Sequence, residues 1–239
     1  MSTSRRSFLQ HTAECVAAST LISVPTLAQQ AKRTQPAKKQ QQEEDVDPPE
    51  DLMREHGLLN RVLLIYEEVI RRVTAREQFD PKPLADSAAI IRTFIESYHE
   101  KLEEDYLFPR FRKAGKLVEL VDTLQAQHAA GRQLTTQIEQ LVKSQSLSND
   151  SDRTRLTTSI QQFIRMYRPH EAREDTILFP ALRSIVSEHE FDALGEEFET
   201  KEHQLFGKEG FEGEVEKVGE IEKQLGIYDL SKFTPKVAP

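Results

Sequence analysis

Apolar side chains recur along most of the chain in steps of three and four residues, the period of an amphipathic α-helix. No sustained alternation of apolar and polar residues, the sign of a half-buried β-strand, interrupts this pattern. Together these features predict an all-α fold with four long helices between residues 50 and 187. The seam positions of the four helices, in chain order, are Leu52, His56, Leu59, Leu63, Tyr66, Ile70 and Val73; Leu84, Ala88, Ile91, Ile95, His99, Glu103 and Tyr106; Leu117, Val121, Leu124, His128, Gly131, Thr135, Ile138 and Val142; and Leu156, Ile160, Phe163, Tyr167, His170, Glu174, Ile177 and Ala181.

Short segments rich in turn-forming residues separate these helices, at residues 79–83, 114–115 and 146–150. Short connections place successive helices antiparallel, so we expect an up-down-up-down four-helix bundle. Pro48-Pro49 suits the first turn of the first helix. Pro169 lies inside the fourth helix, where it removes a backbone donor and is expected to kink the helix.

The C-terminal extension, residues 188–239, contains further apolar residues, with glycines breaking the middle of the segment. We expect one or two extra helices laid against the bundle. A dimerisation surface or a lid over the site is the alternative role for this segment.

The first 28 residues have the features of an export signal. Residues 4–9, Ser-Arg-Arg-Ser-Phe-Leu, resemble a twin-arginine motif, and an apolar stretch over residues 15–27 follows. Residues 29–49 are rich in Gln, Lys, Pro and acidic residues and predict a disordered linker. We therefore expect a twin-arginine-type signal peptide and a periplasmic or extracellular protein with no stable membrane insertion after cleavage. A disordered basic tail or a short anchor helix is the alternative.

The net charge and the cysteine content exclude some classes of partner and of metal site. The 239 residues carry a formal net charge of −8, which argues against a nucleic-acid partner because phosphate binding needs a concentrated basic surface. The single cysteine, Cys15, falls in the predicted signal peptide. Any metal bound by the mature chain must therefore be held by nitrogen and oxygen ligands.

An internal duplication carries the candidate chemistry. Residues 99–109 and 170–180 share the pattern H-E-x-x-E-[ED]-x-x-L-F-P at an offset of 170 − 99 = 71. The histidines of the first and third helices, His56 and His128, repeat at an offset of 128 − 56 = 72. Each half thus offers one lone histidine and one His-x-x-x-Glu pair, His99 with Glu103 and His170 with Glu174.

Helix geometry directs these side chains to one place. Residues four apart share a helix face, so each His-x-x-x-Glu pair presents an imidazole and a carboxylate to the same point. Four imidazoles and two carboxylates would then converge on the bundle axis. Burying an unpaired carboxylate there costs several kcal/mol, and a bound metal cation would offset this cost. If both carboxylates bridge, two six-coordinate ions keep open positions. This donor set favours iron, with manganese as the alternative, over structural zinc.

The residues around these histidines resemble the haemerythrin-like HHE cation-binding domain family over about residues 50–187. The resemblance rests on Arg-Glu-His-Gly-Leu-Leu at 54–59, Gln-His-Ala-Ala-Gly-Arg at 127–132 and the two H-E…L-F-P segments. It implies a four-helix bundle around an oxo- or hydroxo-bridged centre of two iron ions. The implied ligands are His56, His99, Glu103, His128, His170 and Glu174.

One departure from the family matters. Oxygen-carrying haemerythrins have a further histidine one turn after the first on the third helix, and Arg132 stands there in this chain. Glu55, Glu104 or Tyr106 is a candidate to fill the open coordination position, and His203 is a candidate outer or extra ligand. His189 lies in a polar stretch and is not assigned to the site.

The resemblance implies a protein that binds, senses or reacts with a small oxidant, such as O₂, peroxide or NO. A metal- and oxygen-binding protein fits this pattern better than a dedicated enzyme. The alternatives are a di-iron oxidase or peroxidase-like enzyme, an iron storage or delivery protein, and a metal-free interaction module. No hydrolase triad or nucleotide-binding motif is found in a suitable context.

Overall fold

A computed structural model of the chain describes residues 47–78, 80–143 and 149–237. The predicted signal peptide and nearly all of the predicted linker lie outside these residues, as does most of the predicted turn at 146–150. Every regular element of the described part is helical, which confirms the all-α prediction. None of the described helices is both long and apolar enough to cross a membrane.

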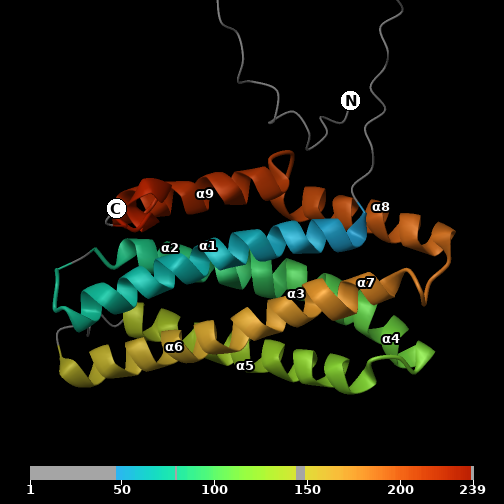
Figure 1. Cartoon of the computed structure of the whole chain (residues 1–239), viewed down its shortest axis with the longest axis horizontal. Helices are drawn as coiled ribbons and strands as arrows, with labels where there is room; N and C mark the ends of the chain where they lie inside the picture. The colour runs from blue at the N-terminus through green and yellow to red at the C-terminus, as the bar shows by residue number, and fades with distance from the viewer. Residues whose placement is uncertain (1–46, 79, 144–148, 238–239) are drawn as a thin grey trace, which may run out of the picture. The chain divides into compact units, whose positions relative to one another are not determined.

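Four long helical segments form the bundle (Figure 1). The first is α1 (Pro48–Thr74), which begins at the predicted proline pair and is capped by the Asp47 carboxylate. The second runs through α2 (Lys82–Ile90), η2 (Ile91–His99), α3 (Glu100–Leu102), η3 (Glu103–Leu107) and α4 (Phe108–Ala114). The third is α5 (Val118–Lys143). The fourth comprises α6 (Asp150–Arg173), η4 (Glu174–Leu178) and α7 (Phe179–Leu182).

Turn chemistry fixes the ends of these helices. Gly115 ends α4 with a left-handed φ of 63°, a conformation that glycine adopts without steric cost. Asn149 caps α6 by accepting a hydrogen bond from the Asp152 N–H at 2.8 Å. Both positions belong to the predicted connections, and helix α6 continues through Pro169.

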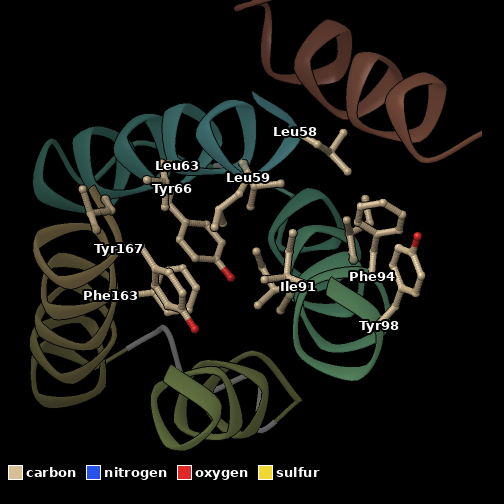
Figure 2. Close-up of a cluster of buried hydrophobic side chains, with 14 of the residues drawn as sticks. Leu58, Leu59, Leu63, Tyr66, Ile91, Phe94, Tyr98, Phe163 and Tyr167 are labelled. Atoms are coloured by element: carbon tan, nitrogen blue, oxygen red, sulfur yellow. The ribbon is translucent and has the colours of Figure 1, made fainter. Parts of the chain in front are cut away.

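The apolar seams form the core, and the aromatic side chains Tyr66, Phe163 and Tyr167 point into the interior between the helices (Figure 2). Tyr167 and Phe163 pack with ring centroids 4.3 Å apart, and Phe163 meets Tyr66 at 5.5 Å. This aromatic layer adjoins the seam histidines, because the edge of Tyr167 meets His170 with ring centroids 5.4 Å apart.

Three seam predictions near the site are off by one residue. Ile177 is 41% exposed, whereas its neighbour Leu178 is fully buried. Tyr106 is only half-buried, and Leu107 takes the core position. Ala181 is likewise half-buried beside the buried Leu182.

Helix winding explains these shifts. An α-helix has about 3.6 residues per turn, so buried residues spaced by four drift around its surface by about 40° per step. Six successive positions at this spacing are nevertheless all buried: Ile91, Ile95, His99, Glu103, Leu107 and Phe111. The helix keeps them on one face by adopting the wider π-helical winding in η2 and η3, and η4 does the same after Glu174.

The C-terminal segment forms α8 (Glu188–Phe206), α9 (Gly210–Leu225) and the short 3₁₀ turn η5 (Leu230–Phe233). Helices α8 and α9 pack along α1, and α9 also contacts α2 (Figure 1). Arg61 on α1 binds Glu222 on α9 through two hydrogen bonds of 3.0 and 2.6 Å. These helices cover the outside of the bundle and contribute none of the four histidines.

Candidate metal centre

The four seam histidines face one another in two pairs inside the bundle. The Nε2 atoms of His56 and His99 lie 3.1 Å apart, and those of His128 and His170 lie 3.2 Å apart. All four imidazoles are at least 96% buried. The structure therefore brings one nitrogen from each bundle helix to a common interior region.

The two glutamates link the pairs. Glu103 lies 3.8 Å from Nε2 of His99 and 3.3 Å from Nε2 of His128. Glu174 lies 3.1 Å from Nε2 of His170 and 3.4 Å from Nε2 of His56. Because each carboxylate reaches one histidine of each pair, each is placed to bridge two cations.

The two glutamates have buried oxygens without hydrogen-bond partners in the described part of the chain, which a bound metal would satisfy. Both carboxylate oxygens of Glu103 and of Glu174 are buried and make no hydrogen bond among the described residues. Leaving a buried acceptor unpaired costs about 1–3 kcal/mol, and more when it is charged. Ligand atoms of Glu103, His128, His170 and Glu174 all lie within 4.8 Å of one another, as do those of His56, His99 and Glu103. The residues present therefore fit a cluster of cations.

Hydrogen bonds at the opposite ring nitrogens orient all four imidazoles. Each Nδ1 faces a side-chain oxygen, so the ring carries its proton there and directs the Nε2 lone pair inward. The four pairs are His56 with Asp175 at 2.7 Å, His99 with Glu55 at 2.8 Å, His128 with Glu104 at 3.1 Å and His170 with Gln127 at 2.9 Å.

The duplication extends to this outer layer. Asp175 repeats Glu104 at 175 − 104 = 71, and Gln127 repeats Glu55 at 127 − 55 = 72. The Phe of each L-F-P segment also has a matching role, because Phe179 stacks on His56 and Phe108 on His128 with interplanar angles of 20°. The centre thus has approximate twofold internal symmetry.

The four candidates for an additional ligand lie in three different settings. Glu55 and Glu104 accept from histidine Nδ1 atoms and so belong to the outer layer. Tyr106 points away from the centre, where its hydroxyl donates to Glu197 at 2.8 Å. His203 lies half-buried in the last turn of α8 and joins none of the metal-binding clusters found among the described residues.

Arg132, one helical turn after His128, is directed into a salt-bridge network. Its Nη2 lies 2.6 Å from Glu100 and 2.7 Å from Glu104. Glu100 in turn accepts a 2.7 Å hydrogen bond from the Tyr167 hydroxyl. Glu104 is therefore shared between His128, Arg132 and the ammonium group of Lys101.

Without metal, expected ligands such as His128 and Glu103 bind protons more tightly than usual, because their pKa values are raised. Burial lowers the pKa of His128, but the neighbouring Glu103 and Glu104 carboxylates outweigh this effect and raise the pKa to about 10. Burial raises the pKa of Glu103, and the nearby Glu174 carboxylate raises it further. Bound cations would replace these protons, since metal ligands must be deprotonated.

Comparison with known proteins identifies the fold family. The family model described as Hemerythrin HHE cation binding domain matches residues 47–182. The chain belongs to this haemerythrin-like HHE family. The match includes all six residues expected to bind metal, and together with their clustering it supports a cation-binding function for this family member.

Sequence similarity to three relatives covers more of the chain than the family domain does. The haemerythrin-like chain is 50% identical over 195 residues to an uncharacterized protein of Mycobacterium bovis and to two uncharacterized proteins of Mycobacterium tuberculosis. Each alignment covers 82% of this chain and 76% of the relative. No solved structure matches the chain significantly.

Two residues of the outer layer were missed by the sequence reasoning. Asp175 occupies the [ED] position of the second repeat, so its match with Glu104 was a usable signal. Gln127 repeats the candidate Glu55 at the offset of 72 that relates His56 and His128, so the duplication held a signal for it too, although its side chain is a neutral amide.

Proposed function

We propose that this protein is an exported non-haem di-iron protein that binds, senses or reacts with a small oxidant such as O₂, peroxide or NO. The observation that carries the proposal is the arrangement of Glu103 and Glu174, each of which reaches one histidine of both pairs. A carboxylate in that position can bind two cations at once. Family membership supports the same conclusion.

The donor set favours iron, with manganese as the alternative. Four imidazole nitrogens and two carboxylates, without any thiolate, suit divalent iron or manganese. If both carboxylates bridge, the six residues supply eight of the twelve positions of two six-coordinate ions. Two iron ions held here would supply open coordination positions for a small ligand, together with one-electron redox chemistry.

The chain's own residues orient the imidazoles of this region and cover two of them. The Nδ1 hydrogen bonds fix the direction in which each imidazole presents its Nε2 atom. Phe108 and Phe179 cover the faces of His128 and His56. A site buried this deeply favours a diatomic molecule or peroxide over an extended organic substrate.

The reaction with oxidant distinguishes the proposal from its rivals. Iron-loaded, reduced protein is mixed with O₂, peroxide or NO, and the visible spectrum and the oxidant consumed per chain are recorded. We expect a spectral change with about stoichiometric consumption. Catalytic consumption with added reductant would instead establish an oxidase or peroxidase-like enzyme, and rapid loss of iron to a chelator would favour storage or delivery.

A pair of histidine variants controls this experiment. His99→Ala removes a buried imidazole of the centre and should abolish the spectral change, because at least one ion is lost. His189→Ala changes an exposed imidazole outside the centre and should leave it intact. Equal behaviour of the two variants would refute the assignment of the centre to these residues.

The export part of the proposal rests on the sequence of residues 4–9. Replacing Arg5 and Arg6 together by lysine should retain the full-length protein in the cytoplasm, since a twin-arginine signal depends on both guanidinium groups. Arg33→Lys makes the same chemical change in the predicted linker and should leave export unchanged. Cell fractionation measures both, and export of the double variant would refute this part.

A further inference from the structure

The two halves of the centre differ in the groups that face their imidazoles. In the first half, His99 Nδ1 faces the Glu55 carboxylate at 2.8 Å. At the equivalent place in the second half, His170 Nδ1 faces the Gln127 amide at 2.9 Å. A negative acceptor is thus replaced by a neutral one within an otherwise repeated arrangement.

The remaining outer carboxylates add to the difference. Glu104, behind His128, is neutralised by salt bridges to Arg132 and Lys101. Asp175, behind His56, has no lysine or arginine within salt-bridge distance among the described residues, and the same is true of Glu55. Two uncompensated carboxylates therefore lie behind one histidine pair, and one amide and one compensated carboxylate behind the other.

Outer partners tune a metal through the ring they touch. A carboxylate that accepts the Nδ1 proton pushes electron density toward Nε2, which makes that nitrogen a stronger ligand for a cation. A neutral amide fixes the ring without this effect. The buried Glu55 carboxylate also stabilises a nearby cation directly through Coulomb attraction in a poorly solvated interior, whereas water screens the partly exposed Asp175.

We infer that the two metal positions are inequivalent: the position at His56 and His99 binds its ion more tightly, and the position at His128 and His170 is the weaker, exchangeable one. The inference rests on the proposed function, which supplies two ions, and goes beyond it by ranking them. Glu55 and Gln127 act as positioning residues that set this ranking.

The test is a titration of metal-free protein with Fe²⁺ under anaerobic conditions, with bound iron measured after equilibrium dialysis at graded free Fe²⁺. The wild type should bind in two separable steps. Glu55→Gln should weaken the tighter step by roughly 10- to 100-fold, the range that loss of such outer partners causes. Gln127→Glu should tighten the weaker step and bring the two steps together, and the half-buried position of Gln127 has room for the isosteric change.

Three further variants assign and control the steps. His128→Ala should remove the weaker step and keep the tighter one, whereas His56→Ala should do the reverse. Gln140→Glu adds the same charge at an exposed position of α5 away from the centre and should leave both steps unchanged. Melting curves in chelator establish that each variant is folded.

The outcomes separate this inference from the function on which it rests. Two steps of equal affinity, or an unchanged weaker step in Gln127→Glu, would overturn the ranking while the di-metal proposal stands. Binding of fewer than two ions by the wild type at saturating Fe²⁺ would overturn both. If one of the reciprocal variants fails to fold, the other still decides the ranking.

Discussion

Gly131 on α5 lies directly against the Tyr167 side chain of α6, next to the centre, and a single methyl group at Gly131 tests this packing. A Cβ at Gly131 would lie 2.1 Å from the Tyr167 Oη and 2.8 Å from its Cζ. The Tyr167 ring is 1% exposed, its hydroxyl is held by Glu100 at 2.7 Å, and its edge meets His170. The ring therefore has nowhere to move without breaking these contacts.

The magnitude follows from opposing effects. Overpacking a core in Gly131→Ala costs about 1–3 kcal/mol. Breaking the hydrogen bond from Tyr167 to the Glu100 carboxylate adds about 1.5–3 kcal/mol. The better helix propensity of alanine returns about 1 kcal/mol. We therefore expect the free energy of unfolding of the metal-free protein to fall by about 1.5–5 kcal/mol, measured by urea denaturation in chelator.

Gly57→Ala is the matched control. Gly57 is an exposed helical glycine of α1, and a Cβ there meets nothing within 4 Å. This variant should raise the free energy of unfolding by about 0.5–1 kcal/mol through propensity alone. Adding Tyr167→Phe to Gly131→Ala removes the nearest clashing atom and should recover only part of the loss, since ring carbons remain within 3 Å. A Gly131→Ala protein as stable as wild type would refute the close packing described at the centre.

Two further predictions concern the C-terminal helices and pH. Glu202→Ala removes a fully buried carboxylate that accepts hydrogen bonds from the Phe211 N–H at 2.9 Å and the Tyr98 hydroxyl at 3.3 Å. The variant should lose about 1–3 kcal/mol of stability and exchange amide hydrogens faster in α8 and α9, with its metal content unchanged. Unchanged hydrogen exchange would contradict this role. In the metal-free protein, burial raises the pKa of Glu171 to about 7, and nearby carboxylates raise that of His128 to about 10. Both groups bind protons more tightly in the folded protein, so the free energy of unfolding measured in urea should fall as pH rises. The fall due to Glu171 lies between pH 4.5 and 7, and that due to His128 between pH 6.5 and 10. A free energy of unfolding that rises over pH 6–9.5 would contradict these pKa shifts.

The sequence predicted the bundle because its signal is local and repeated. Steps of three and four residues place Leu52, Leu59 and Leu63 on one face of α1, and all three are buried. The duplication at offsets of 71 and 72 similarly predicted which histidines share an environment. Both inferences need only helix geometry, which is the same in every protein.

The sequence did not predict features that depend on local helix winding or on contacts between helices. Ile177 was placed in the core by α-helical spacing, and the π-helical turn η4 moves that place to Leu178. The direction of Arg132 depends on Glu100 and Glu104, two carboxylates from another helix. No periodicity within one helix can reveal such a partner.

The most direct test of the account is the metal content of the mature protein, measured by elemental analysis together with visible spectra before and after exposure to air. We expect about two iron ions per chain and oxo-to-iron charge-transfer bands that appear on oxidation. One zinc ion, or no metal, in a protein that keeps its helical fold would contradict it. The buried histidines and glutamates would then be structural residues of the core.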